Sequence, residues 1–146
     1  MDTKRFVIGA LVGTVVLYVV GYLIFQMAFA SFYATNHGSA TGVDRDALVQ
    51  WAMVLANVSY AALITLYLVG RAYPPSIAEG FLIGGLIGFL AWFTADFSFY
   101  SLTNVWNVSV AFVDPLLEFL HAGIGGAAIA AMLARVPKDA GMQPAR

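Results

Sequence analysis

The residues between Arg5 and Asp44 include no Asp, Glu, Lys or Arg, and three further apolar stretches follow along the chain. A helix rises about 1.5 Å per residue, so roughly 20 apolar residues cross the ~30 Å hydrocarbon core of a bilayer. Of the 146 residues, 61% are hydrophobic and 10% are charged, which leaves too few polar side chains to cover a water-soluble domain. The sequence therefore predicts an all-α integral membrane protein with four transmembrane helices in one bundle.

Turn and capping residues give the expected bounds of these helices. Ser76 and Glu79 have the spacing of a capping box, which satisfies free backbone N–H groups at a helix start. Asp114 followed by Pro115 has the pattern of another helix start, with aspartate as the N-cap. We expect residues 1–136 to form the transmembrane domain and residues 137–146 a disordered cytoplasmic tail. The expected helices are residues 6–32, 47–70, 77–100 and 115–134.

The first apolar stretch also has features of a cleavable signal peptide. Lys4 and Arg5 precede it, and Ala28-Phe29-Ala30 has the small-x-small pattern of a cleavage site. The apolar region of a signal peptide is typically about 7–15 residues long, and residues 6–25 already exceed that length. We therefore expect this helix to be retained.

The positive charges predict an orientation. Four spans place both termini on one side of the membrane, and only Arg45 of the seven Lys and Arg residues would lie on the other side. The positive-inside rule then predicts both termini in the cytoplasm (N-in/C-in) and the connections 33–46 and 101–113 outside. The formal net charge of −1 excludes nucleic-acid binding through a basic surface. The absence of cysteine excludes disulfides and thiolate metal sites.

Gly80, Gly84 and Gly88 form a small-residue face on the third expected helix. Glycines at intervals of four allow another helix to approach closely, which is how membrane helices associate by van der Waals packing. This face could pack within the chain, which we favour, or against a second copy or another membrane protein.

Polar side chains also recur at intervals of four in the first helix: Thr14, Tyr18, Tyr22 and Gln26. Residues with this spacing share one face, and lipid would leave their polar groups without hydrogen-bond partners. We therefore expect the face to point into the bundle, close to Asn57 of the second helix.

Ionisable residues occur at four positions in or beside the last two expected helices: Asp96, Asp114, Glu118 and His121. A charged side chain at the bilayer centre costs about 2.5–3.5 kcal/mol on insertion scales, so each one needs a partner or a function. Each could be structural, Asp114 as a helix cap and His121 as a hydrogen-bond partner of Glu118. Together they could also line one polar pocket opening outward, with Glu118 the hardest to explain as structural. The predicted ligand-binding or proton-relay residues are Glu118, His121, Asp96, Asp114, Asn57, Tyr22 and Gln26.

These residues do not identify a cofactor. Asp114, Glu118 and His121 are metal-ligand types, but three groups on one helix rarely complete a coordination sphere. His121 is the one histidine inside an expected span, which makes a haem site the weaker interpretation still. We therefore expect no metal site, and the cofactor, if the protein has one, stays unknown.

The segment Phe99-Tyr100-Ser101-Leu102-Thr103-Asn104, then Val113-Asp114-Pro115 and a Gly/Ala-rich last helix, resembles small bacterial four-helix membrane proteins of unknown function. In those proteins a similar segment precedes an aspartate that opens the last helix. Pro115 and His121 depart from their pattern. The resemblance implies a bacterial inner-membrane protein, and it implies no activity.

Three functions remain open on the sequence. The favoured one is non-enzymatic: binding or passage of a small polar solute, cation or proton, with Glu118 central. The second is an accessory subunit that packs on a larger membrane complex through its glycines. The third is a membrane-embedded enzyme acting on a lipid or quinone, with Glu118 and His121 as an acid/base pair.

Overall fold

The computed structural model describes residues 2–71 and 74–137, and these residues form helices and loops with no strand. Four helical segments are long and apolar enough to cross a membrane: α1 together with η1, α3, α4 and α5. This confirms the predicted all-α four-helix bundle. The predicted disordered tail falls almost entirely on residues 138–146, which lie outside the described residues. The elements are α1 Thr3–Gly21, the π-helix η1 Tyr22–Ala28, α2 Ala30–Thr35, α3 Gln50–Val69, α4 Ile77–Leu102 and α5 Val108–Leu133.

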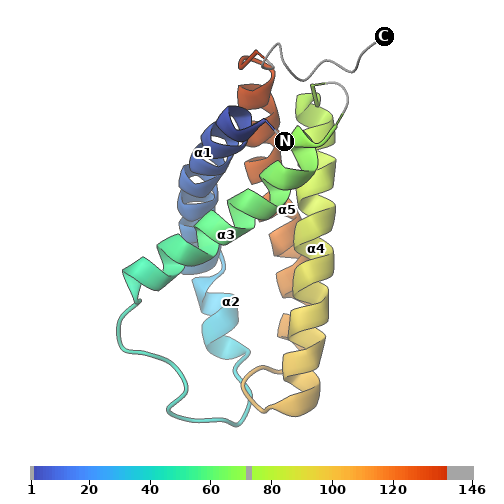
Figure 1. Ribbon diagram of the computed structural model, residues 1–146. Coiled ribbons are helices and arrows are strands. Elements are labelled where there is room, and N and C mark those ends of the chain that lie inside the picture. Colours follow the sequence, from blue (N-terminus) through green and yellow to red (C-terminus); the bar gives the residue numbers. More distant parts are fainter. Residues whose placement is uncertain (1, 72–73, 138–146) are drawn as a thin grey trace.

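The helices are packed unequally (Figure 1). α4 and α5 lie side by side along their lengths, and α1 packs on both α3 and α5, whereas α3 contacts α4 and α5 only sparsely. We call the end that holds the start of α1, the end of α3 and the end of α5 the termini end, and the opposite end, with α2, the loop end. Because α3 runs obliquely, it diverges from α4 toward the loop end.

Glycines bring α4 and α5 into backbone contact. Gly80, Gly84 and Gly88 are buried. A Cβ at Gly84 would meet the carbonyl oxygen of Ala122, and one at Gly80 would meet the carbonyl oxygen of Gly126. The small-residue face predicted on this helix therefore packs within the chain, as close-packed membrane helices do.

A charge-assisted hydrogen bond ties α1 to the last turn of α5. Arg5 is 2% exposed, and its Nη2 donates to the carbonyl oxygen of Leu133 at 2.9 Å. The last carbonyls of a helix lack intrahelical partners and carry partial negative charge, so a guanidinium there stabilises the helix end. Asp2 caps the start of α1, its Oδ1 accepting from the backbone N–H of Arg5 at 3.0 Å.

The two connections at the loop end are joined by backbone hydrogen bonds. The N–H of Gly38 donates to Val105 O at 2.8 Å, and the N–H of Ala40 donates to Asn104 O at 3.0 Å. His37 and Trp106 form an antiparallel bridge beside them. The loop that follows α2 is thereby fixed to the turn between α4 and α5.

The predicted capping box at the start of α4 is confirmed, whereas the predicted start of the last helix is wrong. The Ser76 hydroxyl accepts from Glu79 N at 3.2 Å, and Glu79 Oε2 accepts from Ser76 N at 2.8 Å. The helix α5 begins at Val108, with Asn107 as its cap, so Pro115 lies inside it. A proline within a membrane helix is tolerated when neighbouring groups satisfy the backbone that it frees.

The first expected helix is also not continuous. α1 ends at Gly21 and changes into the π-helix η1, whose i→i+5 pattern is seen in the bond from Phe29 N to Ile24 O at 2.8 Å. The face of α1 that enters the bundle carries Arg5, Gly9, Gly13 and Leu17. The face of Thr14, Tyr18, Tyr22 and Gln26, which we expected to point inward, is therefore not the buried one: Thr14 and Tyr18 are half-buried, and Tyr22 and Gln26 are exposed. Small side chains let α1 approach α3 and α5, so close packing decided which face is buried.

Candidate functional site

A cavity of about 410 Å³ lies where α3 diverges from α4, and we call it the cleft. Five of the elements contribute to its wall: α1, η1, α3, α4 and α5. Its volume falls in the range of about 300–1,000 Å³ that is typical of small-molecule sites. The lining residues are Tyr18, Gly21, Tyr22, Phe25, Gln26, Leu48, Met53, Ala56, Asn57, Tyr60, Leu63, Ala91, Trp92, Asp114, Glu118 and His121.

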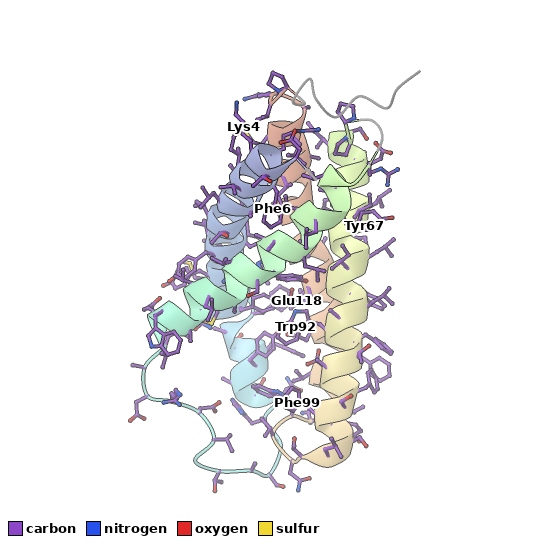
Figure 2. The ribbon with its side chains drawn as sticks, viewed as in Figure 1. Lys4, Phe6, Tyr67, Trp92, Phe99 and Glu118 are labelled. Atoms are coloured by element: carbon purple, nitrogen blue, oxygen red, sulfur yellow. The ribbon has the colours of Figure 1, made fainter. Side chains whose placement is uncertain are left out.

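The cleft has an apolar rim and an acidic floor. Leu63 of α3 is 49% exposed and Trp92 of α4 is 38% exposed, and both lie on helices apolar enough to cross a membrane, so in a bilayer the cleft would open toward lipid. Figure 2 shows Glu118 and Trp92 between Lys4 near one end of the bundle and Phe99 near the other. Glu118 of α5 is only 4% exposed and lies on the inner side of the cleft.

Glu118 and His121 share a proton. The Nε2 atom of His121 lies 2.8 Å from the carbonyl oxygen of Leu17, which can only accept, so Nε2 carries a hydrogen. Nδ1 lies 3.0 Å from Glu118 Oε2. A hydrogen bond there requires one proton, held either by the acid beside a neutral imidazole or by an imidazolium beside a carboxylate. In both arrangements the pair carries no net charge, and the hydroxyl of Tyr60 donates to the same Glu118 oxygen at 3.3 Å.

Asp114 and Asp96 form a second pair, and Asp114 lies one helical turn from Glu118 toward the loop end. Both side chains are buried, Asp96 on α4 and Asp114 on α5, close enough for each carboxyl group to disfavour ionisation of the other. The hydroxyl of Tyr33 on α2 donates to Asp114 Oδ1. Among the described residues, Asp96 Oδ2 is buried with no N–H or hydroxyl donor. Two neighbouring buried carboxyl groups cannot both ionise at low cost, so a proton held by one of them would leave this pair with one negative charge.

We call these four residues the acid–histidine cluster: Asp96, Asp114, Glu118 and His121. With one proton held by each pair, the cluster would have a single net negative charge. No Lys or Arg occurs among the described residues that line the cleft. A buried charge without a counter-charge is unfavourable, so the cluster favours a cation or a further proton.

Six of the seven predicted site residues line the cleft. Asp96 does not, but it neighbours Asp114, which does. Asp114 is not the predicted helix cap, because it lies two turns inside α5. Tyr22 is 54% exposed and stands at the rim rather than inside the bundle. The amide of Asn57 donates to Met53 O of its own helix at 2.8 Å, so it faces the cleft without binding the cluster.

The sequence analysis did not predict that Tyr60 and Tyr33 belong to the site. Tyr60 lies three residues after Asn57, on the same face of α3, which was the available signal. Tyr33 gave no such signal, because it was expected to lie in a connection outside the bundle. The π-helix was missed as well, although π-helical turns often occur at functional sites.

In the described part of the chain, no group of three or more His, Cys, Asp or Glu side chains is placed to hold a metal ion. No protein-family model, curated protein or solved structure matches the chain. The function is therefore inferred from the geometry of the cleft and its cluster.

Proposed function

We propose that the protein is a membrane receptor site for a small amphiphilic cation, which enters the cleft sideways from the bilayer. The observation that carries this proposal is a cavity with an exposed apolar rim and a floor of buried Asp114, Glu118 and His121, with no Lys or Arg among its described lining residues. The apolar body of the ligand would lie along the walls, and its cationic head would reach Glu118. Binding or passage of a purely polar solute is less well supported, because the rim is apolar.

Aromatic rings beside the floor fit the same ligand. Tyr60 and Phe25 stand edge-on to the His121 ring, with centroids 6.0 and 5.6 Å away, and Trp92 lies on the cleft wall. Cations are attracted to the faces of aromatic rings, and this attraction grows when water is excluded. A permanent cation at this position would compensate the charge of the cluster and contact these rings.

The test uses two ions of equal size and opposite charge, tetraphenylphosphonium and tetraphenylborate. Their binding to the full chain in lipid nanodiscs is measured against empty nanodiscs. We expect the cation to bind and the anion not to, and Glu118→Gln to weaken cation binding about tenfold or more, which is ~1.4 kcal/mol. Glu79→Gln is the matched control, because Glu79 caps α4 at the termini end, away from the cleft.

Raising the pH should strengthen cation binding, because each proton that leaves the cluster adds a negative charge. Equal binding of both ions, or binding of the cation that Glu118→Gln leaves unchanged, would contradict the proposal. In that case the accessory-subunit function would lead. Its partner would need a surface other than Gly80, Gly84 and Gly88, because these glycines contact α5.

One observation also supports the enzymatic alternative. The cleft is lined both by exposed apolar residues and by the hydrogen-bonded Glu118 and His121, so a lipid or quinone that entered it would reach an acid/base pair. Turnover of a lipid by the wild type and its loss in Glu118→Gln would favour this alternative. The predicted N-in/C-in orientation in a bacterial inner membrane applies to both proposals and places the loop end outside.

A further inference from the structure

A second cavity, of about 340 Å³, opens at the loop end of the bundle, and we call it the vestibule. It lies between η1, α2, the loop that follows α2 and the α4–α5 turn. His37 Nδ1 is 3.6 Å from Asp44 Oδ2, and the Asp44 side chain is 66% exposed. The vestibule is therefore open to water, unlike the lipid-facing cleft.

The vestibule and the cleft share a wall. Phe25 and Gln26 of η1 line both cavities. Tyr33 lines the vestibule, while its hydroxyl donates a hydrogen bond to Asp114, which lines the cleft. Tyr33 thus connects a water-accessible space to the acid–histidine cluster.

We infer that protons reach the acid–histidine cluster from the vestibule, and that Tyr33 relays them to Asp114. In this step Tyr33 gives its hydroxyl proton to the Asp114 carboxylate while a hydronium ion in the vestibule gives a proton to the Tyr33 oxygen. One O–H bond breaks and one forms at that oxygen, the hydronium becomes water, and Asp114 becomes a neutral acid. The reverse sequence releases a proton.

The state of Tyr33 suits this role. Burial, together with the hydrogen bond to Asp114, raises the pKa of Tyr33 above its ordinary value. Tyr33 therefore stays protonated at any pH that the protein meets, and it always holds a proton to pass on. Its ring packs edge-on against Phe25 and Trp106, with centroids 5.9 and 6.2 Å away, which holds the hydroxyl in place.

Beyond Asp114 a proton has further sites. The carboxyl oxygen Asp96 Oδ2 is buried without an N–H or hydroxyl donor among the described residues, so it is a free acceptor. Glu118 lies one turn further along α5 and shares its own proton with His121. The titratable groups that face Asp114 are Tyr33 from α2, Tyr60 from α3, Asp96 from α4, and Glu118 and His121 from α5.

This inference rests on the proposed function only in using the same cluster, and the two are tested by different measurements. The full chain in lipid vesicles is mixed rapidly with D₂O, and infrared spectroscopy follows the conversion of buried COOH to COOD. Asp114→Asn identifies the band of the Asp96–Asp114 pair. We expect Tyr33→Phe to slow the exchange of that band about tenfold or more, while the amplitude of the band at equilibrium is unchanged.

Tyr67→Phe is the control, because Tyr67 is 55% exposed on α3 and lines neither cavity. A second variant leaves Tyr33 intact. Ala34 is exposed and lines the vestibule, so Ala34→Trp should fill the space and slow the exchange, while Ala28→Trp, exposed on η1 outside both cavities, should not.

Slow exchange in Tyr33→Phe and Ala34→Trp, with normal exchange in both controls, supports the relay. If Tyr33→Phe does not fold, Ala34→Trp against Ala28→Trp decides. If the buried COOH band of Tyr33→Phe or of Ala34→Trp exchanges as fast as that of the wild type, the relay is overturned, even if Glu118→Gln abolishes cation binding. Conversely, slow exchange beside unchanged cation binding in Glu118→Gln keeps the relay and rejects the proposed function.

Discussion

The termini end and the loop end of this bundle are packed in opposite ways. Toward the termini end, Gly80 and Gly84 bring the α4 backbone against α5, and Gly9 and Gly13 bring α1 against α3 and α5. Toward the loop end, α3 leaves α4 and the helix α1 gives way to a π-helix, so a cavity of about 410 Å³ remains. The same chain is close-packed in one half and open in the other.

The ionisable groups follow this division. In the packed half Arg5 is buried, and it is engaged by the last turn of α5. In the open half the four residues of the acid–histidine cluster have no Lys or Arg beside them among the described residues. Close packing at one end can therefore hold the helices in register while the other end keeps charge and space for a ligand. The comparison predicts that stability and binding respond to different substitutions.

The largest expected effect is on stability, from Gly84→Ile. A Cβ at this position would meet the Ala122 carbonyl oxygen and lie 3.1 Å from the Gly126 Cα, both parts of the α5 backbone, which cannot move aside. Overpacking of this kind typically costs about 1–3 kcal/mol, and we expect the upper end. Thermal unfolding in detergent measures the loss. Leu82→Ile, at a position of α4 that is 54% exposed, is the control, and equal unfolding of the two variants would show that the glycine contact is dispensable.

Arg5→Gln should have the next largest effect. It removes the charge-assisted hydrogen bond to Leu133 O, and hydrogen bonds to charged groups contribute about 1.5–3 kcal/mol. We expect unfolding to be easier by about 2 kcal/mol, measured in the same detergent, with tetraphenylphosphonium binding unchanged. Lys4→Gln, at an exposed neighbouring position, should change neither quantity. Loss of binding in Arg5→Gln would mean that the two ends are coupled after all.

The fold could be predicted from the sequence because the signal is local. A span of about 20 apolar residues is required wherever a helix crosses lipid, whatever its neighbours are. Ser76 and Glu79 were likewise sufficient to predict a helix start, since a capping box involves only residues within one turn. Asp114-Pro115 has an equally good local pattern, yet the helix starts seven residues earlier than Pro115, at Val108. Asn107 caps the helix there instead, its side chain accepting from Ser109 N at 2.9 Å.

The site could be predicted only in part. Glu118, His121 and Asp114 lie on one face of one helix, so their spacing predicted that they share a cavity wall. Tyr33 belongs to α2, and nothing in its neighbourhood along the chain predicts its contact with Asp114, 81 residues away. Which face of α1 is buried depends on the helices that its glycines contact. These helices are distant in the sequence, so the residues of α1 alone do not predict that face. Whether the cluster binds a ligand stays a prediction.

A smaller effect is expected from Tyr60→Phe, in the open half. The change removes the hydroxyl that donates to Glu118 Oε2 at 3.3 Å and keeps the ring. A neutral hydrogen bond contributes about 0.5–1.5 kcal/mol, and this one is long, so stability should fall by roughly 0.5 kcal/mol. Cation binding should change more than stability does, because the carboxylate loses a partner that orients it. A calorimetric titration with tetraphenylphosphonium, run beside thermal unfolding, measures both. Tyr67→Phe, on an exposed part of α3, is the control.

The smallest effect on stability, with the largest effect on binding, is expected from Ala56→Trp. Ala56 is exposed and lines the cleft, so an indole at this position can lie in the space where α3 diverges from α4 without displacing a packed side chain. Surface substitutions of this kind usually stay within about 0.5 kcal/mol. The free energy of unfolding should therefore be that of the wild type, while tetraphenylphosphonium binding is lost.

Leu55→Trp separates filling of the cleft from the mere addition of a large side chain. Leu55 is the neighbouring residue on α3, is 57% exposed and does not line the cleft, so its variant should bind as the wild type does. If Ala56→Trp binds the cation normally, the ligand does not occupy the cleft. If it unfolds as easily as Gly84→Ile does, a substitution in the open half costs as much stability as one in the packed half. The two ends would then not differ in how tightly they are packed. A stable Ala56→Trp variant that no longer binds would separate the two roles within one chain.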